Sequence, residues 1–356
     1  MKARRSVPGA ISVQGRIRGF DGLRGIAVLF VILFHAQHIL ATEPPLIRFF
    51  DGGWSGVDMF FVLSGFLITG ILRNTRDHPH YWKIFAIRRA LRILPLYSLI
   101  LALAILPRLV VGVNEGPPYW VYPVFLSNFW IALAGGHNLP LDVTWSLSIE
   151  EQFYVLWPLV IRMVSLRQLT GVCIVLILAA PLIRFFLHDP SNEISYMWTP
   201  CRMDSLAWGA LASIAWEQQS ERWCTWAARV APPGVLAWVL LLAASGDIRS
   251  NGIFAVLGFS AFPAIIAAVV LAIASGQLET WNRVLEWRPL KHLGKVSYGA
   301  YLLHGPVIAA LHGTMLLGHP NLGMLAAVLL TWAIATLFWR RIESPILAKK
   351  SELAPY

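Results

Sequence analysis

An arginine and a histidine lie within one apolar stretch near the start of the chain, from Gly22 to His38. His35 follows Arg24 by eleven residues, three helical turns and about 20° more, so a helix places both side chains on one face, roughly 16 Å apart. Asp21 precedes Arg24 by three residues and is expected to pair with it. A charge in hydrocarbon costs about 2.5–3.5 kcal/mol, so this face must turn toward the bundle interior or a water-filled path. Because imidazole is the usual general base near neutral pH, His35 is a candidate catalytic group; the competing interpretation is a snorkelling arginine and a packed histidine.

A pair of carboxylates provides a second chemical signal, in the stretch "TWSLSIEEQFYVLWP". Glu150 and Glu151 stand side by side where an apolar segment begins, and such a pair is costly there unless it is neutralised or does chemistry. Glu150 and Tyr154 share a helix face, whereas Glu151 points about 100° away. A functional role for Glu150 is therefore favoured over simple helix capping.

Arginines mark the beginning of another apolar segment, in "AIRRALRILPLY". Arg89 and Arg92 are three residues apart and share a helix face. The planar guanidinium offers paired donors that suit a phosphate group, so these two arginines are candidates for an anion site. The alternative is an ordinary basic anchor at the membrane surface.

Other apolar stretches also carry polar residues. Asp58 is expected near the outer end of its segment, while Ser64 and Gly65 fall in the middle, where small residues let a helix or a ligand approach closely. Tyr301 and His304 are three apart on one helix face, and a second histidine inside an apolar segment indicates a polar cavity. The alternative for His304 is a packed, hydrogen-bonded histidine.

The composition indicates that apolar helices position these residues. The chain has 356 residues, of which 57% are hydrophobic and 13% charged, whereas soluble domains carry nearly twice that charge. Apolar runs long enough to cross a bilayer recur throughout, so we predict an all-α, polytopic transmembrane bundle of about ten spans. The predicted spans are 20–40, 56–72, 93–112, 152–166, 170–187, 203–217, 230–246, 253–275, 297–317 and 322–339.

Basic residues are distributed unequally between the two sides of this bundle. With the N-terminus inside, 23 Lys and Arg residues fall on inner segments and five on outer ones, which predicts that both termini are cytoplasmic. The net charge of +10 is thus explained without a nucleic-acid partner. The three cysteines show no zinc-binding spacing, and no metal is expected. Arg202 and Asp204 are predicted to form a local ion pair at the start of one span.

Taken together, these stretches resemble acyltransferase family 3, the integral-membrane O-acyltransferases. The family is marked by an Arg or Lys, ten intervening residues and a His, and by four further motifs in order. The matching stretches here are Arg24 to His35, Asp58 to Phe66, Arg89 to Arg92, Trp145 to Tyr154 and Ser297 to Pro306. On this basis residues 1–18 form a basic N-terminal tail, 19–345 the acyltransferase membrane domain and 346–356 a short C-terminal tail. No C-terminal esterase-like domain is expected.

The resemblance implies transfer of an acyl group, often acetyl, from cytoplasmic acyl-CoA to a hydroxyl of a surface carbohydrate, in a bacterial inner membrane. Arg89 and Arg92 would meet the CoA phosphates, and the pantetheine arm would pass Arg24 and Ser64 to reach His35. Glu150 would orient or charge-balance the imidazole. Residues expected to line the path or support it are Asp58, Trp145, Glu151, Tyr154, Tyr301 and His304.

The sequence leaves alternatives open for the chemical route, the acceptor and the class of protein. His35 either deprotonates the acceptor for direct attack on the thioester or carries the acyl group as an acyl-imidazole. The acceptor could instead be a small metabolite such as a macrolide. A proton-coupled secondary transporter would also use buried Arg, His and carboxylate groups. The oligomeric state and the role of residues 1–18 are left undetermined.

Overall fold

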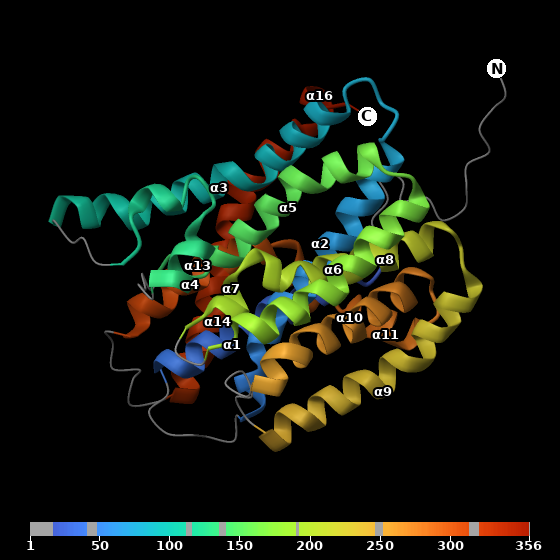
Figure 1. The fold of residues 1–356 in the computed structure, drawn as a ribbon. Helices are drawn as coiled ribbons and strands as arrows, with labels where there is room; N and C mark the ends of the chain where they lie inside the picture. Colours follow the sequence, from blue (N-terminus) through green and yellow to red (C-terminus); the bar gives the residue numbers. More distant parts are fainter. Residues whose placement is uncertain are drawn as a thin grey trace.

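The computed structural model describes residues 17–40, 48–111, 116–134, 140–189, 192–245, 252–312 and 320–355. Within these ranges the chain is helical and contains no strand, which confirms the predicted all-α class (Figure 1). The longer helices are α1 (Phe20–Leu40), α2 (Ser55–Asn74), α3 (Tyr81–Val111), α5 (Thr144–Met163), α6 (Leu166–Leu187), α8 (Thr199–Glu217), α9 (Glu221–Ser245), α10 (Phe259–Ala274), α13 (Ser297–His312) and α14 (Pro320–Phe338). The shorter helices are η1 (Arg48–Trp54), η2 (Tyr119–Val121), α4 (Ser127–Ala134), α7 (Ile194–Met197), η3 (Phe254–Gly258), α11 (Glu279–Leu285), α12 (Arg288–Lys295), η5 (Trp339–Glu343), α15 (Ser344–Ala348) and α16 (Lys350–Leu353).

Each predicted span overlaps one of the longer helices, although α3 and α5 begin earlier than predicted and residues 313–317 of the ninth span lie outside the described residues. In the described part of the chain, seven segments are long and apolar enough to cross a membrane, and the protein is an integral membrane protein. Three of the longer helices fall outside this set. Helices α5 and α8 carry charged residues in their apolar runs, and α13 has only 16 residues. The count of ten spans therefore remains a prediction.

Two groups of helices surround the centre of the bundle (Figure 1). Helix α8 packs against α2, α6 and α10, and α9 covers the outer side of α10. Helix α1 packs against α2, α12, α13 and α14. Because α1 and α2 also contact each other, they join the two groups.

The contact between α2 and α8 depends on glycine. A Cβ atom on Gly65 would lie 2.0 Å from the carbonyl oxygen of Leu206, and one on Gly209 would lie 2.0 Å from that of Val62. The two backbones therefore touch, as is common where small residues line a membrane-helix interface. Gly65 thus serves helix packing, while its neighbour Ser64 faces a pocket described below.

The orientation of the bundle is a testable prediction from the charge distribution. Arg184 and Arg202, which the sequence count assigns to outer segments, lie buried inside the bundle. If the predicted orientation holds, the exposed outer surface is even less basic than that count implied. We expect a reporter fused after Tyr356 to behave as cytoplasmic: GFP should fluoresce and alkaline phosphatase should be inactive. The opposite pattern would contradict the predicted orientation and, with it, a cytoplasmic donor site.

Candidate active site

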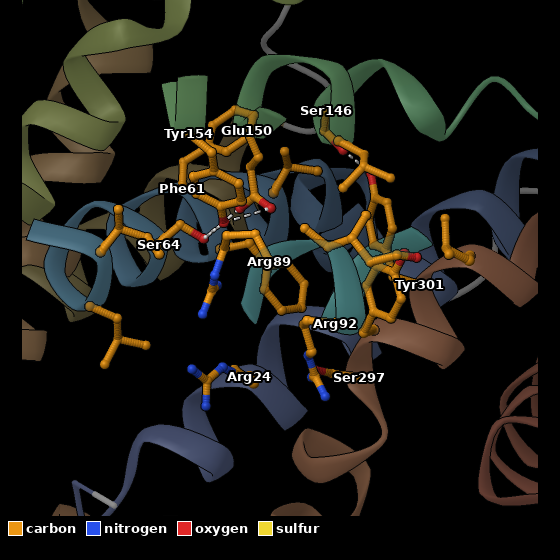
Figure 2. Close-up of a pocket in the computed structure, with 18 residues that line it drawn as sticks. Arg24, Phe61, Ser64, Arg89, Arg92, Ser146, Glu150, Tyr154, Ser297 and Tyr301 are labelled. Atoms are coloured by element: carbon orange, nitrogen blue, oxygen red, sulfur yellow. Dashed lines mark hydrogen bonds between the residues drawn. The ribbon is translucent and has the colours of Figure 1, made fainter. Parts of the chain in front are cut away.

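Helices α1, α2, α3, α5 and α13 surround a pocket of about 150 Å³ (Figure 2). Three arginines, a glutamate, three serines and three tyrosines line it together with apolar side chains. The polar lining residues are Arg24, Ser64, Arg89, Arg92, Ser146, Glu150, Tyr154, Ser297, Tyr298 and Tyr301. Such a concave site with a few converging polar groups is the usual form of a small-molecule site.

One side of the pocket is cationic. In Figure 2 the arginine side chains gather below the Glu150 carboxylate. Arg24 forms the predicted ion pair with Asp21, at 2.9 Å between Nη1 and Oδ1. Arg92 lies 3.6 Å from the carboxylate of Glu343. Arg89 stacks over aromatic rings, and among the described residues its buried Nε has no hydrogen-bond partner. This side therefore offers a donor group suited to an anion.

A hydrogen-bonded triad forms the opposite wall. Ser64 Oγ donates to Glu150 Oε1 at 2.5 Å, and the Tyr154 hydroxyl lies 3.3 Å from Ser64 Oγ and 3.4 Å from Glu150 Oε2. The contact between Glu150 and Tyr154 agrees with their predicted common helix face. The neighbouring Glu151 does not line the pocket, and its buried Oε1 has no hydrogen-bond partner among the described residues.

Beyond this pocket the structure brings two histidines into contact. Nε2 of His304 lies 3.3 Å from Nδ1 of His35, and their ring centroids are 4.9 Å apart. Tyr301 lines the pocket and packs against the His304 ring, at 5.5 Å between centroids. Its hydroxyl lies 2.5 Å from Ser146 Oγ and 3.0 Å from the carbonyl oxygen of Val143. Tyr301 therefore connects the pocket to the histidine pair.

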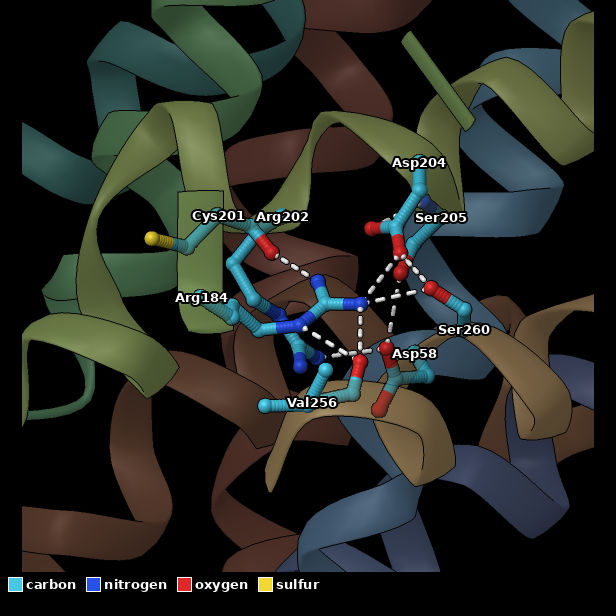
Figure 3. A network of polar contacts seen from close by, with 8 residues as sticks. All are labelled: Asp58, Arg184, Cys201, Arg202, Asp204, Ser205, Val256 and Ser260. Carbon is cyan, nitrogen blue, oxygen red and sulfur yellow. Dashed lines mark hydrogen bonds and ion pairs between the residues drawn. The ribbon is translucent and has the colours of Figure 1, made fainter. Parts of the chain in front are cut away.

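Asp58 lies in a different place, in a buried network between α2, α6, α8 and α10 (Figure 3). Its Oδ1 accepts from Arg202 Nη2 at 2.5 Å and from Ser205 Oγ at 2.9 Å. Asp204 pairs instead with Arg184, at 2.9 Å. The predicted local ion pair between Arg202 and Asp204 is therefore wrong. Helix packing gives each a partner from another helix.

Arg184 is a residue of this network that sequence reasoning missed. All four charged side chains are fully buried, and Arg184 also donates to Ser260 Oγ and to the carbonyl oxygens of Val256 and Cys201. The available signal was a lone arginine inside an otherwise apolar segment, which should have been assigned a buried partner.

The network predicts a large stability effect. We expect Asp58→Ala to destabilise the protein by about 3–5 kcal/mol, because it leaves the buried Arg202 charge without its carboxylate. The midpoint of thermal unfolding in detergent should fall by more than about 5 °C. Asp77→Ala is the control, since Asp77 is exposed just beyond α2. An unchanged midpoint for Asp58→Ala would contradict this assignment.

The structure thus gathers most, but not all, of the predicted site residues. Those that line the pocket are Arg24, Ser64, Arg89, Arg92, Glu150, Tyr154 and Tyr301. Trp145 instead packs against Tyr196, at 4.8 Å between ring centroids, and does not line the pocket. Ser146, Ser297 and Tyr298 line it without having been singled out individually, although they lie within the recognised stretches. The described residues contain no cluster of three or more His, Cys, Asp or Glu side chains able to hold a metal.

Comparison with known proteins agrees with these motifs. A family model described as an acyltransferase domain matches residues 17–340. YrhL of Bacillus subtilis, named as a candidate peptidoglycan O-acetyltransferase, is 31% identical over 93% of this chain and 55% of its own length. The peptidoglycan O-acetyltransferase OatA of Listeria monocytogenes is 28% identical over 93% of this chain and 56% of its own length. The O-acetyltransferase OatA of Staphylococcus aureus is 27% identical over 93% of this chain and 57% of its own length. The chain spans little more than half the length of these curated relatives, and no solved structure shows a significant match.

Proposed function

The chain belongs to this acyltransferase family, and from that premise we propose that it is a membrane O-acetyltransferase of the bacterial plasma membrane. The proposed reaction moves an acetyl group from acetyl-CoA to a hydroxyl of a cell-wall glycan. The names of two relatives, YrhL and the OatA of Listeria monocytogenes, support the glycan acceptor. The observation that carries the proposal is a pocket with arginines on one side and a polar connection to a histidine pair beyond it.

The donor is assigned from the chemistry of the arginine side. CoA carries phosphate groups at one end and its thioester at the other, so the molecule needs a cationic anchor and a less charged channel. Arg89 and Arg92 would hold phosphate oxygens with charge-assisted hydrogen bonds. Glu343 lies beside Arg92, so a bound phosphate would have to replace its carboxylate as the partner of Arg92. Arg24, held by Asp21, would brace the path at the start of α1.

The polar groups of the pocket are proposed to guide the thioester toward His35. Ser64, Glu150 and Tyr154 provide a hydrogen-bonded wall, and Tyr301 leads to the histidines. In the direct route, His35 takes the proton of the acceptor hydroxyl while the hydroxyl oxygen attacks the thioester carbonyl. The carbon–sulfur bond then breaks, and the imidazolium returns the proton to the leaving CoA thiolate.

The first test is chemical and uses the purified full chain in proteoliposomes. With acetyl-CoA and no acceptor, we expect slow release of the CoA thiol, because water replaces the acceptor hydroxyl. A secondary transporter has no reason to release it. Absence of thiol release from folded protein, with and without added peptidoglycan strands, would contradict the proposal.

The second test addresses the acceptor. The protein should be produced in a bacterium that lacks its own peptidoglycan O-acetyltransferase, and the acetate released by alkali from purified peptidoglycan should be measured. We expect ester-linked acetate above the level of cells producing His35→Gln. Equal amounts of ester-linked acetate in the two strains, with thiol release intact in proteoliposomes, would reject peptidoglycan as the acceptor but not the acetyltransferase activity.

A further inference from the structure

We propose that His304 is a positioning residue that holds His35 in the tautomer with the basic nitrogen at Nε2. This inference rests on the proposed function, because it concerns how His35 is prepared for proton transfer. His304 belongs to α13 and His35 to α1, and the two helices pack directly against each other. The His304 side chain is fully buried, and the structure aims it at the His35 ring.

The backbone around His304 determines where its proton resides. Its Nδ1 is within hydrogen-bond distance of the carbonyl oxygen of Tyr301, one turn earlier in the same helix. A carbonyl oxygen only accepts, so Nδ1 must carry the hydrogen. In the neutral imidazole this leaves a lone pair on Nε2, the nitrogen that faces His35.

The same reasoning applies to His35. Its Nδ1 lies 2.9 Å from the carbonyl oxygen of Val31, also one turn earlier, so this nitrogen carries a hydrogen as well. The Nδ1 hydrogen is shared between Val31 O and His304 Nε2, which lie 2.9 and 3.3 Å from the Nδ1 nitrogen. Both contacts favour the same tautomer, and the lone pair of His35 is then at Nε2.

The consequence concerns the moment of proton transfer. When Nε2 of His35 takes a proton from the acceptor, positive charge develops on the ring. The Val31 carbonyl and the His304 lone pair both accept from Nδ1–H and therefore stabilise that charge without gaining a proton themselves. Because Tyr301 links His304 to the pocket, occupation of the pocket and orientation of the catalytic ring are structurally connected.

The test measures CoA-thiol release from acetyl-CoA by proteoliposomes containing the full chain. We expect His304→Leu to lower kcat by roughly 10- to 100-fold, the loss that removal of a hydrogen-bond partner orienting a metal-bound imidazole typically causes. KM for acetyl-CoA should stay within about 2-fold, because His304 lies outside the donor pocket. His304→Gln should recover most of the lost kcat, since its amide oxygen can accept from His35 Nδ1–H.

Two further variants separate the possible failures. His312→Gln alters an exposed histidine on the same helix and should leave kcat unchanged. If His35→Gln is inactive while His304→Leu has wild-type kcat, the positioning role is rejected and the proposed function stands. If His35→Gln is fully active, the catalytic role of His35 is rejected and the positioning role of His304 with it, whereas absence of thiol release by the wild type rejects the proposed function itself. Equal losses in His304→Leu and His304→Gln, with lowered unfolding midpoints, would assign His304 to packing and overturn the inference.

Discussion

His35→Ala is expected to abolish acetyl transfer while leaving the protein folded in the membrane. Removal of the imidazole eliminates the group that takes the acceptor proton, and loss of a general base alone lowers the rate by about 10²–10⁴-fold. Folding should tolerate the change, because His35 is only partly buried. Alkali-released acetate from peptidoglycan and CoA-thiol release in proteoliposomes provide the two readouts.

The same variant distinguishes the two chemical routes. If His35 carries the acetyl group covalently, radiolabelled acetyl-CoA should leave an acid-quenched acetyl-protein adduct in the wild type that is absent from His35→Ala. If His35 is only a base, no adduct forms and a residual rate remains. His188→Ala is a suitable control, because His188 lies after α6 and outside the pocket. Near-normal transfer by His35→Ala would reject His35 as the catalytic group and would require another base in the site.

Arg89→Gln combined with Arg92→Gln should weaken acetyl-CoA binding by two or more decades. Each charge-assisted hydrogen bond is worth roughly 1.5–3 kcal/mol, and the pair faces the same pocket. Arg89 stands out because its buried Nε lacks a hydrogen-bond partner among the described residues, so a bound phosphate would satisfy an unpaired donor. Binding should be measured with tritiated acetyl-CoA and detergent-solubilised protein.

Arg88 supplies a matched control for this prediction. It precedes Arg89 on the same helix, but its Nε donates to the carbonyl oxygen of Ala354 at 2.9 Å, and it does not line the pocket. Arg88→Gln removes the same kind of charge at the same membrane level, so a general surface-charge effect would weaken binding equally in this variant. We expect donor affinity close to that of the wild type. Unchanged affinity in the Arg89/Arg92 double variant would return these residues to the role of membrane anchors.

Hydropathy alone identifies the helices of this protein less well where they carry buried charged residues. Helix α5 contains Glu150 and Glu151, and α8 contains the buried pair-forming residues Arg202 and Asp204. These polar groups lower the apolar character of both helices, which consequently fall outside the seven long apolar segments. Both helices were nonetheless among the predicted spans, at 152–166 and 203–217, because apolar residues surround these polar groups.

The sequence by itself determined the features that depend on local helical geometry. Apolar runs predicted the all-helical class, and the helical repeat placed Asp21 with Arg24 and Glu150 with Tyr154, as the structure confirms. Each of these pairs lies within one turn of a single helix, where the backbone geometry is known in advance. The repeat also placed Arg89 and Arg92 on a common face, which the structure turns toward one pocket.

Only the tertiary structure decided which distant residues meet. Ser64 reaches Glu150 across 86 positions, Asp58 reaches Arg202 across 144, and His35 reaches His304 across 269. In soluble helices an apolar stripe marks the inner face, but membrane helices are apolar on the lipid side as well, so that signal is weak. Helix contacts here depend on shape, such as the approach of Gly65 and Gly209 to the facing backbones, and on buried polar pairing. These interactions arise only when the helices are assembled.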